Sequence, residues 1–209
     1  MIKILLLIDY SSEFDRKLLR GLVQYSKENG PWLFYRLPSY YSAMYGEQGI
    51  LKWAKEWKAD AIIGQWNNDT IDLQKELNIP VVLQNYHHRS VTYSNLTGDY
   101  KGTGRMAAQF FAKRMFRNFA YFGVKGVVWS DERSQGYRQE VKRMGGEYFS
   151  FESDKQEDEI RMEVSQWLQK LPKPVALFCC DDAHALFISE TCKMTNIPIP
   201  EEIALLGVD

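Results

Sequence analysis

Short aliphatic runs alternate along the chain with segments of helical periodicity. Residues 4–8 form a continuous apolar run that ends at polar residues, which is typical of a strand covered on both faces in a parallel sheet. Apolar positions in residues 14–23 then recur at helical spacing until Asn29-Gly30-Pro31 interrupts them, and residues 32–36 resemble a second strand. This part of the sequence predicts one strand–helix–strand unit.

The same alternation continues to the last residue. Further strands are expected at residues 61–64, 81–83, 119–123, 148–151, 175–178 and 203–206. Helices are expected around residues 50–57, 71–77, 106–111, 137–144, 160–171 and 183–195. Because no hairpin signal interrupts the alternation, we predict an α/β fold of two Rossmann-like lobes with parallel sheets. We place the boundary near Arg117 and Asn118, which gives an N-terminal lobe of residues 1–117 and a C-terminal lobe of residues 118–209.

Composition excludes several classes of protein. The 26 Lys and Arg residues are balanced by 27 Asp and Glu residues, so the net charge of −1 gives no general attraction for nucleic acid. The first apolar run is far shorter than the roughly 20 residues of a membrane span, and no signal-peptide cleavage site follows it, so we expect a cytoplasmic protein. Cys179, Cys180 and Cys192 lack the spacing of zinc or redox motifs, and we expect buried, reduced thiols.

Gly102, Gly104 and Ala107 match the dinucleotide-binding pattern G-x-G-x-x-G/A, but their context does not fit. In that fingerprint the first glycine directly follows the first strand, and an acidic residue ends the next one. Here the preceding apolar run ends at Leu96, and residues 124–128 contain no acid. A nucleotide-dependent Rossmann enzyme is therefore the weaker alternative, and small residues that ease helix packing are the stronger one.

Candidates for catalysis or metal binding are few. The adjacent pair His87 and His88 has poor geometry for one metal ion, and we find no Glu or Cys at ligand spacing near these residues or His184. Cys179 and Cys180 end a buried strand without an obvious histidine partner. We expect no enzymatic activity, no metal and no cofactor.

Polar side chains gather instead where the predicted strands end, which is the edge of an α/β sheet where ligands bind. Carboxylates and amides exchange hydrogen bonds with hydroxyl groups, and aromatic rings cover the apolar face of a sugar. A polyhydroxylated ligand suits this chemistry, whereas helix capping and core packing are the simpler roles for the same residues. The strand-end residues and neighbouring aromatics are Asp9, Phe14, Trp66, Asn67, Asn85, Tyr86, Trp129, Asp181 and Asp209.

Six short segments, spread along the chain from near its start to its last residue, carry family motifs. They are residues 14–21, 58–63, 78–82, 98–100, 133–137 and 197–209. They resemble the ligand-binding domain of LacI/GalR regulators, which is similar to periplasmic sugar-binding proteins. Residues 13–16 and 129–133 resemble xylose-operon regulators of the AraC type, in which such a sensor precedes an AraC-like DNA-binding domain. The chain also begins at the first sensor strand, whereas LacI-type members place a helix-turn-helix ahead of it.

The resemblance implies a type I periplasmic-binding-protein-like fold that senses a sugar, D-xylose or a similar pentose, between two lobes. It implies that Asp99 opens the last helix of the N-terminal lobe toward the cleft and that Arg133 reaches the ligand from the C-terminal lobe. Asp181 and Asp209 are then expected to contact hydroxyl groups. LacI-type sequences typically have Asn at the position of Asp181, so whether Asp181 or Asp182 faces the ligand is open at this point.

The resemblance also implies a homodimer that binds operator DNA through a domain absent from this chain. A further helix, the strands that complete both lobes and the DNA-binding domain are expected beyond Asp209. We therefore expect a sensor fragment, truncated at its C-terminus, that binds sugar weakly or not at all and does not bind operator DNA. A sugar-binding transport protein is the second alternative, but it would need an export signal, and we identify none.

Overall fold

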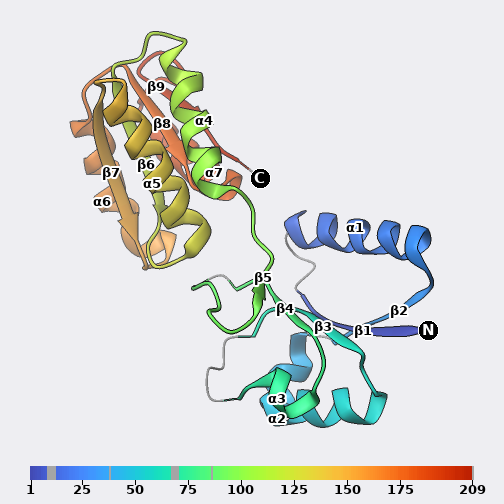
Figure 1. Ribbon diagram of the computed structural model, residues 1–209. Helices are drawn as coiled ribbons and strands as arrows, with labels where there is room; N and C mark the ends of the chain where they lie inside the picture. Colours follow the sequence, from blue (N-terminus) through green and yellow to red (C-terminus); the bar gives the residue numbers. More distant parts are fainter. Residues whose placement is uncertain (9–12, 38, 67–70, 86, 209) are drawn as a thin grey trace. The chain divides into compact units, whose positions relative to one another are not determined.

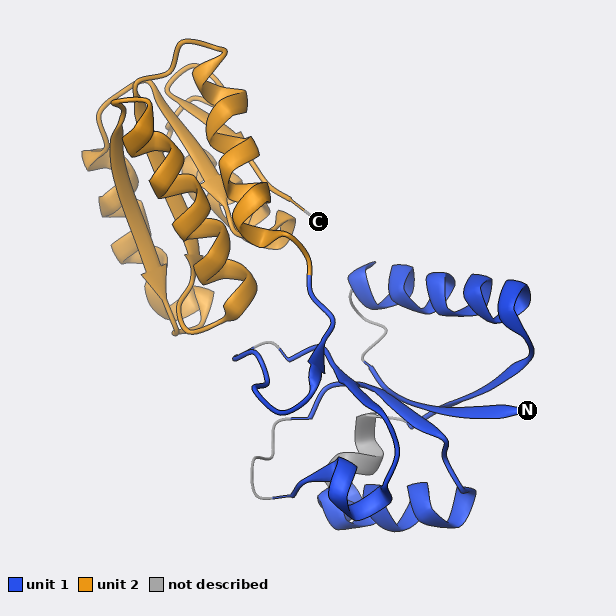
Figure 2. Ribbon diagram, viewed as in Figure 1, with its two compact units in different colours: residues 1–97 blue, residues 98–209 orange. Residues whose placement is uncertain are grey.

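The computed structural model describes residues 1–8, 13–37, 39–66, 71–85 and 87–208. The chain divides into two compact units, Met1–Thr97 and Gly98–Asp209 (Figure 2). Each unit contains one parallel sheet with helices on both faces (Figure 1). None of the described helices is both long enough and apolar enough to span a lipid bilayer.

The first unit is built on a five-stranded sheet in the order β2-β1-β3-β4-β5. Its strands are β1 (Ile2–Leu7), β2 (Trp32–Arg36), β3 (Ala61–Gly64), β4 (Val81–Leu83) and β5 (Ser94–Asn95). Its helices are α1 (Glu13–Asn29), α2 (Ser39–Trp57) and α3 (Leu73–Leu77). Ile4 and Leu6 pack against the α1 side, whereas Leu5 packs against the α2 side. Burial of both faces of β1 explains why its sequence is continuously apolar.

The second unit is built on a four-stranded sheet in the order β7-β6-β8-β9. Its strands are β6 (Asn118–Val124), β7 (Glu147–Ser153), β8 (Val175–Cys179) and β9 (Ile203–Leu206). Its helices are α4 (Tyr100–Ala112), α5 (Val128–Arg143), α6 (Glu157–Lys170) and α7 (Asp182–Met194). Phe122 packs with α6 and α7 on one face, and Tyr121 packs with α4 and α5 on the other. All three cysteines are buried and free, as expected.

The division between the units falls between Thr97 and Gly98, not between Arg117 and Asn118, because α4 packs on the second unit. A Cβ atom at Gly104 would clash with the carbonyl oxygen of Arg133 in α5. The backbones of α4 and α5 therefore come into contact at Gly104, where a residue with a side chain would not fit. The order of elements along the chain suggested a boundary near Arg117 and Asn118, but the close packing of α4 on α5 places α4 in the second unit.

Local packing accounts for both glycines that match the dinucleotide pattern. Gly136 of α5 reciprocates the contact of Gly104, since a Cβ atom there would clash with the carbonyl oxygen of Lys101 in α4. Gly102 packs against the carboxylate of Asp99, which caps α4. Gly104 therefore serves helix packing, as the stronger alternative predicted, and Gly102 leaves room for the capping carboxylate.

Strand β5 was not predicted from the sequence. It consists of Ser94 and Asn95, two exposed polar residues without a hydrophobic pattern. It exists because these residues pair in parallel with Val82 and Leu83 of β4. The strands and helices that were predicted are present, and the bounds of β2, β3, β4 and β9 are those expected.

Candidate functional site

Two segments of the second unit meet at the carboxyl edge of its sheet. Strands β6 and β8 are parallel neighbours with Phe122 opposite Cys179, so the turns that follow them lie at the same edge. Helix α5 follows β6, and α7 follows β8. The first turns of both helices are therefore placed where parallel α/β sheets commonly bind ligands.

Arg133 of α5 reaches across this edge. Its Nη1 donates a hydrogen bond to the carbonyl oxygen of Cys180 at 2.5 Å. Its Cζ lies 5.3 Å from the centre of the Tyr100 ring and 5.4 Å from the centre of the Trp129 ring, within the range of cation–π attraction. Its Nε is buried and has no hydrogen-bond partner among the described residues. A buried donor of this kind is stabilised by any acceptor that reaches it.

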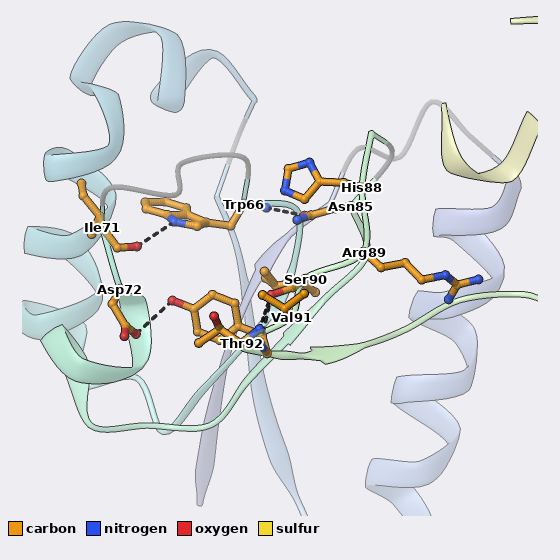
Figure 3. A pocket seen from close by; sticks show the side chains of 11 residues that line it. Trp66, Ile71, Asp72, Asn85, His88, Arg89, Ser90, Val91 and Thr92 are labelled. Atoms are coloured by element: carbon orange, nitrogen blue, oxygen red, sulfur yellow. Dashed lines mark hydrogen bonds between the residues drawn. The ribbon is translucent and has the colours of Figure 1, made fainter. Parts of the chain in front are cut away.

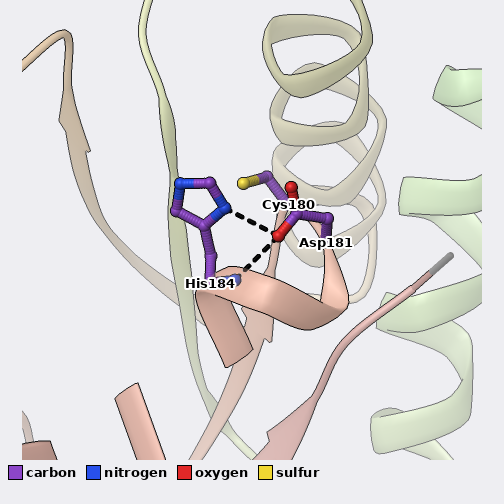
Figure 4. A group of neighbouring side chains, drawn as sticks. All are labelled: Cys180, Asp181 and His184. Carbon is purple, nitrogen blue, oxygen red and sulfur yellow. Dashed lines mark hydrogen bonds and ion pairs between the residues drawn. The ribbon is translucent and has the colours of Figure 1, made fainter. Parts of the chain in front are cut away.

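Asp181 and His184 form a hydrogen-bonded pair at the start of α7 (Figure 4). Asp181 caps the helix, because its Oδ1 accepts a bond from the backbone nitrogen of His184 at 2.7 Å. The same Oδ1 lies 2.6 Å from Nδ1 of the His184 ring. Because the N-cap turns the chain sharply, the side chain three residues later returns to the capping carboxylate.

The pair is charged at neutral pH. Burial raises the pKa of Asp181, but the hydrogen bonds from His184 and the attraction of Arg133 outweigh it, so the pKa is lowered. Burial lowers the pKa of His184, but the hydrogen bonds with Asp181 and Cys180 outweigh it and raise the pKa to about 10. Asp181 is therefore ionised and His184 protonated over the physiological range.

The two adjacent acids have different surroundings. Asp181 is close enough to Arg133 for the guanidinium to lower its pKa. The carboxylate of Asp182 packs instead against Gly207, where a Cβ atom would clash with it. The carboxylate on the side of Arg133 is thus that of Asp181.

Among the described residues, Cys180, Asp181 and His184 form the one group of three side chains of types that can hold a metal ion, with the three candidate ligand atoms within 4.8 Å of one another. We expected no histidine near Cys180, and this was wrong, because the first turn of α7 returns His184 to the end of β8. A divalent cation would have to displace the proton shared by Asp181 and His184 and lie near the Arg133 guanidinium. The arrangement therefore favours a charged, hydrogen-bonded pair over a metal site.

The first unit has its own cavity of about 320 Å³ at the carboxyl ends of β3 and β4 (Figure 3). Trp66 forms part of its wall, with Nε1 donating to the carbonyl oxygen of Ile71 at 3.2 Å. Its backbone nitrogen donates to Oδ1 of Asn85 at 3.1 Å. On another part of the wall, the hydroxyl of Tyr93 donates to Asp72 at 3.0 Å. The volume lies within the range of small-molecule pockets.

The predicted site residues therefore fall into separate groups. Trp129, Arg133 and Asp181 come together in the second unit. Trp66 lines the cavity of the first unit, and Phe14 lies in the first turn of α1 with 37% of its surface exposed. Asp9, Asn67, Tyr86 and Asp209 lie outside the described residues.

The prediction for Asp99 needs a correction. Asp99 opens a helix, as expected, but α4 belongs to the second unit and not to the N-terminal lobe. Its Oδ1 accepts a hydrogen bond from the backbone nitrogen of Gly102 at 2.8 Å, so capping is its observed role.

Tyr100 and His184 were missed as site residues. Tyr100 directly follows the N-cap of α4, and His184 lies three positions after the N-cap of α7. The available signal was the position of each residue shortly after an acid that caps a helix. The first turn of such a helix places its side chains beside the edge of the sheet.

Comparison with known proteins agrees with this architecture. Residues 108–209 match the family of the periplasmic binding protein-like domain. The xylose operon regulatory protein of Escherichia coli strain K12 is 22% identical over 220 residues, an alignment that covers 99% of this chain and 54% of that protein. The chain thus spans about half the length of this curated relative.

Two solved structures show the same fold. The xylose-binding transcription activator xylR matches with a TM-score of 0.77 and 19% identity, covering 99% of this chain and 54% of that one. A periplasmic binding protein/LacI transcriptional regulator from Alkaliphilus metalliredigens QYMF, in complex with D-xylulofuranose, matches with a TM-score of 0.68 and 16% identity. That match covers 100% of this chain and 77% of the other. The fold is therefore periplasmic-binding-protein-like, with parallel sheets in two lobes.

Proposed function

We propose that this chain is the effector-sensing part of a transcription regulator, and that its effector is a sugar, D-xylose or a similar pentose. The observation that carries the proposal is the Arg133 guanidinium, whose buried Nε has no partner among the described residues and which lies near an ionised Asp181. The similarity to a xylose operon regulatory protein over 99% of the chain supports the same reading.

The chemistry of these groups suits adjacent sugar hydroxyls. A guanidinium only donates hydrogen bonds and a carboxylate only accepts them, whereas each hydroxyl does both. A pair of neighbouring hydroxyls would accept from Nε of Arg133 and donate to Oδ2 of Asp181, which accepts no hydrogen bond from the described residues. The Trp129 and Tyr100 rings offer apolar faces for the C–H groups of the sugar.

The proposal includes the other expected sugar contacts, Asp9, Phe14, Trp66, Asp99 and Asp209. Polar groups at the wall of the first-unit cavity, such as Asn85, supply the chemistry that a hydroxylated ligand needs there. The sugar is bound and released without chemical conversion. Operator DNA is contacted through other parts of a homodimeric regulator, and such a protein works in the cytoplasm.

Calorimetric titration of the full-length regulator that contains this chain, with D-xylose, L-arabinose, D-ribose and NAD, tests the proposal. We expect heat of binding with at least one pentose and none with NAD, because the described site offers hydroxyl partners and the glycines of α4 are used in packing. Binding of NAD, or the absence of heat with all three pentoses, would contradict the proposal.

A further inference from the structure

We infer that His184 is a positioning residue for sugar recognition, which fixes the Asp181 carboxylate so that Oδ1 is occupied and Oδ2 is left for the ligand. The inference rests on the proposed function and adds to it a residue that does not itself contact the sugar. It also gives the site a defined dependence on pH.

The geometry of the pair supports this role. Two donors from the same residue, the backbone nitrogen and Nδ1 of His184, both end on Oδ1 of Asp181, at 2.7 and 2.6 Å. Two bonds to one oxygen fix the rotation of the carboxylate, so the direction of Oδ2 is set before any ligand arrives. The side chains of His184 and Asp181 are 20% and 29% exposed, so the pair is shielded but accessible.

The groups around His184 determine how its replacement would change the pKa of Asp181. The groups that raise its pKa are Asp181 and Cys180, both at the β8–α7 turn, and the ring of Phe122 from β6 lies 5.9 Å from its own. Arg133 from α5 acts on Asp181. Without His184, burial would raise the pKa of Asp181 with only Arg133 and the helix backbone opposing it. Protonation of Oδ2 would turn this oxygen into a donor, so it would no longer accept the hydrogen bond from the sugar hydroxyl.

The test compares the sugar affinity of the full-length regulator that contains this chain, as the wild type, His184→Ala and His184→Asn, from pH 4 to pH 8. The amide nitrogen of Asn stands in for Nδ1 as a neutral donor. At pH 7 we expect His184→Ala to weaken pentose binding about tenfold and His184→Asn to restore most of the affinity, because one charge-assisted hydrogen bond is lost or replaced. In His184→Ala the loss of affinity on acidification should also begin at a higher pH than in the wild type, because the hydrogen bond from the His184 ring that lowers the pKa of Asp181 is gone.

Glu190→Ala, an exposed change on the same helix, is the matched control and should leave both affinity and pH profile unchanged. Nuclear magnetic resonance of the His184 ring provides a readout that needs no ligand. We expect a titration midpoint near pH 10 in the wild type and a clear fall in Asp181→Asn.

The outcomes separate the two claims. If the wild type binds no pentose, the proposed function fails and the inference fails with it. If the wild type binds a pentose but both His184 variants show its affinity and its pH profile, the inference alone is overturned. If His184→Ala does not fold, the His184→Asn pH profile and the ring titration decide, since a midpoint near pH 6.5 would show that the pair does not exist.

Discussion

Among the described residues, the Arg133 guanidinium has a hydrogen-bond partner for Nη1 and none for Nε. Nη1 is held by the carbonyl oxygen of Cys180, and Nε is buried. The first bond orients the group, and under the proposed function Nε donates to a sugar hydroxyl. This combination distinguishes Arg133 from arginines such as Arg143, whose guanidinium is paired with Glu140 in the same helix.

Replacing Arg133 by Ala should weaken pentose binding by roughly ten- to a hundredfold, because a hydrogen bond to a charged group contributes about 1.5–3 kcal/mol. Arg133→Lys keeps the charge but not the fork of donors, and we expect an intermediate affinity. Calorimetric titration measures both. Arg138→Ala, an exposed change in the same helix, should bind like the wild type; an equal loss in Arg138→Ala and Arg133→Ala would remove Arg133 from the site.

At the scale of elements, the contact between α4 and α5 decides how the second unit is built. The helices meet through Gly104 and Gly136, and Gln109 of α4 donates to Glu140 of α5 at 2.8 Å. Phe111 and Tyr137 continue the contact into the core. Helix α4 is thus a structural part of the unit whose strands follow it in sequence.

Gly104→Ala should therefore lower the free energy of unfolding by about 1–3 kcal/mol, the usual range for a side chain forced into a packed contact. Its Cβ would meet the backbone of Arg133 and Tyr137, which cannot move as a flexible side chain would. Chemical denaturation followed by circular dichroism measures the change. Gly21→Ala in α1 is the matched control: its Cβ meets nothing within 4 Å, and we expect it to stabilise by about 0.4–1 kcal/mol. Equal effects of the two substitutions would contradict the proposed packing role.

Whether an element can be predicted from the sequence depends on the interactions that stabilise it. β8 is buried at every position and is visible as an apolar run, whereas β5 is polar and depends on pairing with β4. Asp181 was predictable as a residue at a strand end, and Arg133 from a resemblance. His184 was missed, because its only signal was its position three residues after a capping acid, and the N-cap turn is what brings its ring back to Asp181.

At the scale of the whole molecule, the chain is two compact units whose boundary follows packing and not the order of strands. Each has its own buried core on both faces of its sheet. Each also carries candidate binding groups at the carboxyl edge of its sheet, the first-unit cavity and the cluster around Arg133.

Two fragments test the boundary. Residues 98–209 should fold by themselves, because they retain α4 and its contact with α5. Residues 118–209 should not fold stably, because removal of α4 exposes the face of Phe119, Tyr121 and Tyr137. Dispersion of amide signals in nuclear magnetic resonance spectra distinguishes the two. Equally well-dispersed spectra would show that α4 is dispensable and that the boundary near Arg117 and Asn118 is adequate.

The glycine contact between α4 and α5 lies at Arg133 itself, since the carbonyl oxygen that a Cβ at Gly104 would strike belongs to this residue. The backbone of the proposed sugar-binding arginine is therefore clamped by a neighbouring helix before any ligand arrives. A clamped residue loses little conformational entropy when it binds, so more of its hydrogen-bond energy is left to distinguish one hydroxyl arrangement from another. Under the proposed function, helix packing that touches no ligand would thus favour discrimination among the stereoisomers of a pentose.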